Sequence, residues 1–205
     1  MTRNVLLISA GIFHPPLLGR FWLRRMLSNL SGYSILQMTS MESLPQLDLE
    51  YLDGMILNIH HKIITEQALQ AFDDYVSAGG GVLAMHATTA SFKHTTRFFE
   101  ILGGQFSSHG PVETFQVMPS RSTDDIFGQL AGFTCKDELY LHDLSDDIRV
   151  HYYTNHQDEP VPMVWTRLHA DGRVCYTCPG HRSATLRIPA YQAILKRGLQ
   201  WVCGG

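Results

Sequence analysis

Short apolar runs alternate with segments of helical periodicity through the first half of the chain. Four runs rich in aliphatic residues are typical of strands buried on both faces and lie at 5–9, 34–38, 53–59 and 82–85. Between and after them, apolar side chains recur every three or four residues, which predicts helices over 17–30, over 65–78 and through 98–102. Strands and helices in this order predict an α/β fold, with a mainly parallel sheet flanked by helices.

The second half of the chain is less regular. Its apolar stretches predict strands at 112–118, 138–142, 150–154, 163–166 and 173–177, followed by a closing helix over 185–202. We find no internal repeat, low-complexity tract or linker that marks a boundary. Since 205 residues suit one α/β domain with a substantial core, we expect a single domain over 1–205.

Composition narrows the class of protein. Hydrophobic residues make up 44% of the chain, and no apolar run approaches the roughly 20 residues that cross a bilayer. The first residues have no signal-peptide cleavage pattern, so we expect a cytoplasmic protein. The net charge is -3 and no Lys/Arg-rich block is present, which argues against nucleic acid or an anionic membrane as a partner.

Four cysteines are too few for a disulfide framework in a chain of this length. Cys175 and Cys178 form a C-x-x-C, but this pair lies in a predicted strand and not at the start of a helix. We therefore interpret them as reduced structural thiols.

Histidines gather where predicted strands end. Phe13 and His14 follow the first strand, His60 and His61 follow the third, and His86 follows the fourth. Ligands of parallel sheets bind beyond the carboxyl ends of the strands. We therefore expect these side chains to face one site.

The second half adds further candidates: His109, Glu138, Tyr140, His181 and Arg182. His181 follows the last predicted strand through a glycine, so its imidazole can project from a tight turn. Histidine exchanges protons near neutral pH or ligates metals, and a buried glutamate can hold a proton or complete a metal shell.

Two kinds of site remain open on these residues. The first is a proton-transfer site with the catalytic residues His86, His109, Glu138 and His181. The second is a divalent-metal site, for an ion such as zinc, with the ligands His86, His109 and His181. No H-E-x-x-H spacing is present, so a metal site would depend on long-range assembly. Substrate-binding candidates are Phe13, His14, His60, Tyr140 and Arg182, although core packing is the simpler interpretation of the aromatic ones.

Motifs spread over nearly the whole chain resemble the ThuA-like (trehalose utilisation) family. They are Gly11-x-Phe13-His14-Pro15, the stretch from Phe72 to His86 with its three glycines, Leu102-Gly103-Gly104-x-Phe106-x-x-His109, Asp137-Glu138-Leu139-Tyr140, Pro162-x-x-Trp165 and the stretch from Gly172 to His181.

The resemblance implies a flavodoxin-like sheet of the class I glutamine amidotransferase type. Amidotransferases of that type carry a nucleophilic cysteine at the turn after a central strand, whereas this turn reads Ala84-Met85-His86-Ala87-Thr88. Without a thiolate to attack the glutamine carbonyl, we expect no glutamine hydrolysis.

The resemblance also implies carbohydrate metabolism, beside oxidoreductases that make keto-sugars. We therefore expect acid/base or metal-assisted chemistry on a sugar such as trehalose, another disaccharide or a keto-sugar. The alternative is a non-catalytic sugar-binding or regulatory partner of a sugar dehydrogenase. Whether the protein forms a homo-oligomer stays open.

Overall fold

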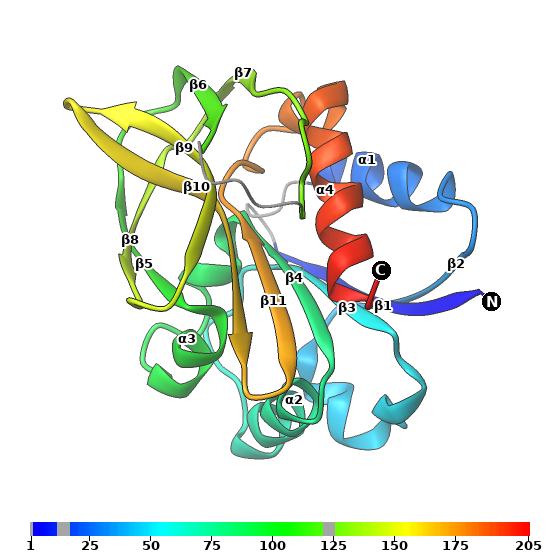
Figure 1. Ribbon diagram of the computed structural model, residues 1–205. Coiled ribbons are helices and arrows are strands. Elements are labelled where there is room, and N and C mark those ends of the chain that lie inside the picture. The colour runs from blue at the N-terminus through cyan, green and yellow to red at the C-terminus, as the bar shows by residue number, and fades with distance from the viewer. Residues whose placement is uncertain (1, 12–16, 121–125) are drawn as a thin grey trace.

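A nine-stranded sheet in the order β2-β1-β3-β4-β11-β10-β9-β6-β7 runs through the computed structural model, which describes residues 2–11, 17–120 and 126–205 (Figure 1). Its first five strands are mutually parallel: β2 (Tyr33–Met38), β1 (Arg3–Ala10), β3 (Gly54–Ile59), β4 (Gly81–Met85) and β11 (Gly172–Thr177). The α/β fold and the parallel sheet predicted from the sequence are thus confirmed.

Antiparallel strands extend this sheet beyond β11. They are β10 (Glu159–His169), β9 (Arg149–His156), β6 (Glu113–Pro119) and β7 (Phe133–Asp137). A separate antiparallel pair consists of β5 (Gly104–His109) and β8 (Tyr140–Leu144). Two residues, Glu138 and Leu139, separate the end of β7 from the start of β8. They lie where the chain passes from the large sheet to the two-stranded sheet.

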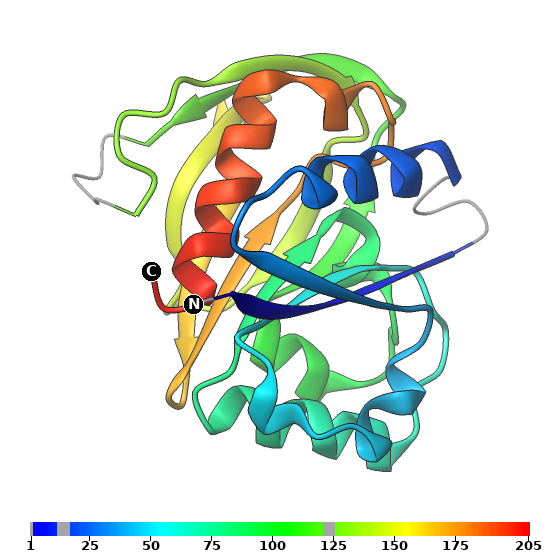
Figure 2. The same ribbon diagram turned by 90° about the vertical axis from the view of Figure 1, so that its right-hand side faces the viewer.

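Helices cover both faces of the parallel part (Figures 1 and 2). One face carries α1 (Leu17–Ser28) and α4 (Pro189–Val202), and the other carries α2 (Glu66–Ser77) and α3 (Thr96–Leu102). The described residues also form short 3-10 helices: η1 (Met41–Gln46), η2 (Leu49–Tyr51), η3 (His86–Ala90) and η4 (Thr185–Arg187). Every residue of β3 and β4 is buried, as strands between two helical layers require. None of the described helices is long and apolar enough to cross a membrane.

Trp165 joins the parallel and antiparallel parts. Its side chain is fully buried, its ring lies 4.1 Å from that of Tyr176, and its Nε1 donates to the Leu102 carbonyl oxygen at 3.1 Å. These contacts place Trp165 in the core and not on a substrate.

Several predicted boundaries were wrong. Strands β5 and β7 were not predicted, and the strand predicted at 138–142 begins at Tyr140, which leaves Glu138 in the link after β7. The closing helix is interrupted between η4 and α4, because Pro189 disfavours helical geometry at the residue before it.

Gly81 is required where α4 meets β4. A Cβ at Gly81 would lie 1.9 Å from the Val202 carbonyl oxygen, so Gly81→Ala must force the helix away from the strand. We expect urea unfolding to show a loss of about 2 kcal/mol or more. Gly110→Ala is the matched control, because a Cβ there meets nothing within 4 Å. Equal stability of the two variants would contradict this account of the packing.

Candidate functional site

His86 occupies a strained turn immediately after β4. Its φ is 42°, in the left-handed region that non-glycine residues seldom adopt, and only 1% of its surface is exposed. Its carbonyl oxygen accepts hydrogen bonds from the Tyr176 hydroxyl at 2.9 Å and the Thr89 hydroxyl at 3.2 Å. Strain of this kind persists only where the surroundings hold it, and it concentrates at functional sites.

The imidazole of His86 is oriented by the residue that follows the neighbouring strand, β11. Its Nδ1 lies 2.9 Å from the Cys178 carbonyl oxygen, which can only accept, so Nδ1 carries the hydrogen. In the neutral ring, the lone pair then lies on Nε2. Gly180 leaves room for this ring, since a Cβ there would lie 2.9 Å from His86 Cβ.

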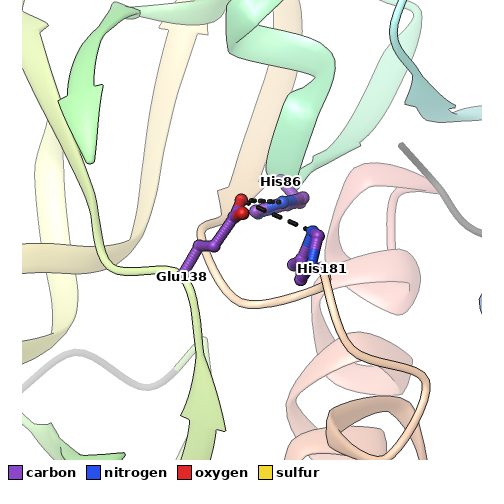
Figure 3. A group of neighbouring side chains, drawn as sticks. All are labelled: His86, Glu138 and His181. Atoms are coloured by element: carbon purple, nitrogen blue, oxygen red, sulfur yellow. Dashed lines mark ion pairs between the residues drawn. The ribbon is translucent and has the colours of Figure 1, made fainter. Parts of the chain in front are cut away.

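Three side chains from distant segments converge at this point (Figure 3). Glu138 Oε2 lies 3.6 Å from His86 Nε2 and 3.4 Å from His181 Nδ1. His86 follows β4, Glu138 lies between β7 and β8, and His181 follows β11. One ligand atom from each residue lies within 4.8 Å of the others. We call this group the His–Glu–His cluster.

The charges in the cluster depend on one another. Burial alone would raise the pKa of Glu138, but the nearby His86, His181 and His109 together lower it to about 2. Burial lowers the pKa of His181, and the Glu138 carboxylate partly opposes that effect. Glu138 is therefore an anion at neutral pH, with two imidazoles against it.

The geometry of the His–Glu–His cluster fits a divalent cation. Ligand atoms about 2.0–2.2 Å from a tetrahedral zinc ion lie about 3.4 Å from one another, and the two distances to Glu138 Oε2 are 3.4 and 3.6 Å. The third pair, one nitrogen each of His86 and His181, lies within 4.8 Å. Metal-binding histidines usually donate their other ring N–H to a carbonyl or carboxylate, as His86 does to Cys178. Three ligands would leave a coordination position open.

His109 lies beside the cluster and not in it. The residue is exposed at the end of β5, its ring stacks on Tyr140 at 5.5 Å, and its Nδ1 lies 2.7 Å from the Gly110 carbonyl oxygen. Glu138 thus completes the trio in which we had expected His109 as a metal ligand.

The predicted substrate-binding residues occupy different positions. Tyr140 is 3% exposed and packs against the His86 ring at 4.2 Å, and both burial and the Glu138 carboxylate raise its pKa. His60 and Arg182 are exposed, at the end of β3 and next to His181 respectively. Phe13 and His14 lie outside the described residues.

A hydrogen-bond network behind His86 was not anticipated. His142 Nε2 lies 3.1 Å from both the Thr89 and the Tyr176 hydroxyl, the same two groups that donate to His86. Burial lowers the pKa of His142 to about 3, so this imidazole stays neutral. The sequence shows two polar residues, Thr88 and Thr89, shortly after His86. Their spacing does not indicate that Thr89 contacts His142.

A hollow in the surface lies away from the cluster. It has a volume of about 850 Å³ and is bounded by Leu44, Asp53, Tyr75 and Arg173, near the amino ends of the parallel strands. The cluster lies at their carboxyl ends, where parallel sheets bind ligands.

A mostly parallel sheet flanked by helices, with a histidine at the turn after β4, defines an α/β protein of the flavodoxin-like class. The chain belongs to the ThuA family: the family model described as trehalose utilisation matches residues 4–202.

Solved structures agree with this assignment. A ThuA-like protein from Parabacteroides merdae has a TM-score of 0.87 at 20% identity, covering 100% of this chain and 91% of that one. A ThuA-like protein from Bacteroides uniformis has a TM-score of 0.81 at 19% identity, covering 98% and 91%. A Salmonella typhimurium protein described as a cytoplasmic protein has a TM-score of 0.72 at 13% identity, covering 97% of this chain and 99% of that one. No curated protein matches the chain.

The partly buried, neutral imidazole of His142 predicts acid sensitivity. Its pKa of about 3 in the folded protein is below the value of about 6.5 in the unfolded chain, so its contribution is complete above pH 6.5 and is lost as the pH falls toward 3. We expect His142→Gln to reduce the pH dependence of unfolding free energy between pH 6.5 and 4, by up to about 1.4 kcal/mol per pH unit. The exposed His94→Gln variant should keep the wild-type dependence. An unchanged slope in His142→Gln would contradict the assignment.

Proposed function

We propose that this protein is an enzyme that acts on a sugar, with a divalent cation such as zinc held by His86, Glu138 and His181. The observation that carries the proposal is the position of Glu138 Oε2, 3.6 Å from an imidazole nitrogen whose ring is locked by Cys178 and 3.4 Å from a second imidazole. A bound cation would polarise a carbonyl oxygen or activate water.

The sugar substrate is supported by family membership. The matching family is described as trehalose utilisation. We further propose an oxidoreductase that makes keto-sugars as the partner. We therefore propose a disaccharide or its keto derivative as the substrate, and the cytoplasm as the location. Exposed Arg182 and His60 at the strand ends are suitable donors to sugar hydroxyls.

The chain's own residues have defined tasks in this proposal. Cys178 and the strained turn orient His86, while Glu138 supplies negative charge between the two histidines. Tyr140 covers one side of the His86 ring and excludes water from it. A keto group acidifies the neighbouring C–H, so an imidazole or carboxylate that accepts its proton would start isomerisation or elimination.

The same residues can perform this proton transfer without a metal. Elemental analysis of protein purified without a histidine tag separates the two mechanisms. A stoichiometric divalent metal supports the metal-assisted mechanism, and full turnover by metal-free protein supports acid/base chemistry alone. Binding of the sugar without conversion, even with the dehydrogenase present, would instead indicate a regulatory subunit.

Substitutions in the cluster test the proposal directly. We expect His86→Ala and His181→Ala each to remove the stoichiometric metal and to lower turnover of a keto-disaccharide at least about 100-fold, because each removes a ligand or a base. Circular dichroism should show both variants folded.

The matched control is His169→Ala. His169 lies at the far end of β10, where its Nε2 is 3.0 Å from Asp73 Oδ1, and its loss should leave metal content and turnover unchanged. Full activity in both His86→Ala and His181→Ala would overturn the proposal.

A further inference from the structure

Asp137 is a completely buried carboxylate directly before Glu138. Its surface is 0% exposed, although it ends β7, the edge strand of the nine-stranded sheet. Burying an ionised carboxylate is costly unless hydrogen bonds satisfy it. The partners of Asp137 therefore indicate why the residue is there.

Four donors from two segments converge on this carboxylate. Oδ1 accepts the backbone N–H of Glu138 at 2.9 Å and that of His181 at 3.0 Å. Oδ2 accepts the backbone N–H of Arg182 at 3.4 Å and the hydroxyl of Thr185 at 2.5 Å. A neutral side chain of the same shape could not accept all four.

One oxygen atom thus joins the backbones of two cluster residues. Glu138 and His181 both donate to Oδ1, and their side chains meet 3.4 Å apart. No strand pairing joins their segments in the described residues, since β7 pairs with β6, and β11 with β4 and β10. Their relative position therefore depends on Asp137.

Another contact holds the same loop without Asp137. The Tyr191 hydroxyl on α4 donates to the Pro179 carbonyl oxygen at 2.5 Å. Removing the charge of Asp137 should therefore loosen the 181–182 backbone while the preceding turn stays docked.

We propose that Asp137 is a positioning residue, which sets the distance between the Glu138 carboxylate and the His181 imidazole and thereby the strength with which the cluster binds a cation. This inference rests on the proposed function for the cation, but the distance itself can be measured without one. Asp137 contacts no substrate and is not a catalytic residue.

Asp137→Asn tests the proposal, because asparagine keeps the size but has one accepting oxygen in place of two, so two of the four donors lose their acceptor in either orientation of the amide. We expect a 10–100-fold weaker Zn²⁺ affinity by calorimetry, the range found when groups supporting metal ligands are replaced. The absorption spectrum of bound Co²⁺ should also change, since it reports ligand geometry and a general loss of stability would not alter it.

Asp73→Asn is the matched control. Asp73 is also a carboxylate in a hydrogen-bond network, partly buried and 2.6 Å from Arg97 Nε, but it lies on α2 and not at the cluster. This variant should lose stability yet keep the wild-type Zn²⁺ affinity and Co²⁺ spectrum. Wild-type affinity and spectrum in Asp137→Asn would overturn the proposal.

A readout in metal-free protein separates this inference from the proposed function. The imidazole ¹⁵N chemical shifts of His181 at fixed pH depend on the nearby carboxylate, and Asp137→Asn should change them while Asp73→Asn does not. If wild-type protein binds no Zn²⁺, the metal-assisted function fails, and the His181 shifts still decide the role of Asp137. Unchanged shifts in Asp137→Asn would then reject it.

Discussion

The hydrogen bond from His86 Nδ1 to the Cys178 carbonyl oxygen is the interaction on which the site depends. It links residues 92 positions apart in the chain, and it follows from strand register, because β4 and β11 pair as far as Met85 and Thr177. The residues that directly follow these strands are His86 after β4 and Cys178 after β11. A shift of register by one residue would turn the imidazole to the other face of the sheet and separate it from Glu138.

Asp137 and Glu138, two consecutive acidic residues at the end of β7, have different surroundings. Asp137 turns inward, where backbone donors surround it, and Glu138 turns toward the imidazoles. This alternation is what an extended chain imposes on successive side chains. One residue therefore organises the backbone while the next provides a charged group to the site.

The parallel half of the fold could be predicted because its signals are local: aliphatic runs and helical periodicity appear within ten or twenty residues. Strand β5 was missed because Phe106 is its one large apolar residue, so the run lacks a buried pattern. The place of His86 after β4 was predictable, since a strand end is visible in sequence. That His86 lies beside Glu138 and His181 was only a hypothesis. The pairing of β4 with β11 joins segments far apart in the chain, and such a pairing produces no characteristic residue spacing in the sequence. The role of Asp137 was hidden, as nothing in a sequence distinguishes an acid that turns inward from one in solvent.

The wide separation of the cluster residues along the chain has a consequence for folding. Contacts between remote segments form late, after the entropy of closing long loops has been paid. Since β11 must dock on β4 before Cys178 can meet His86, the cluster is assembled only in a nearly complete fold. A molecule that binds there recognises the folded chain and not its unfolded form, so its affinity adds to the stability of the whole sheet.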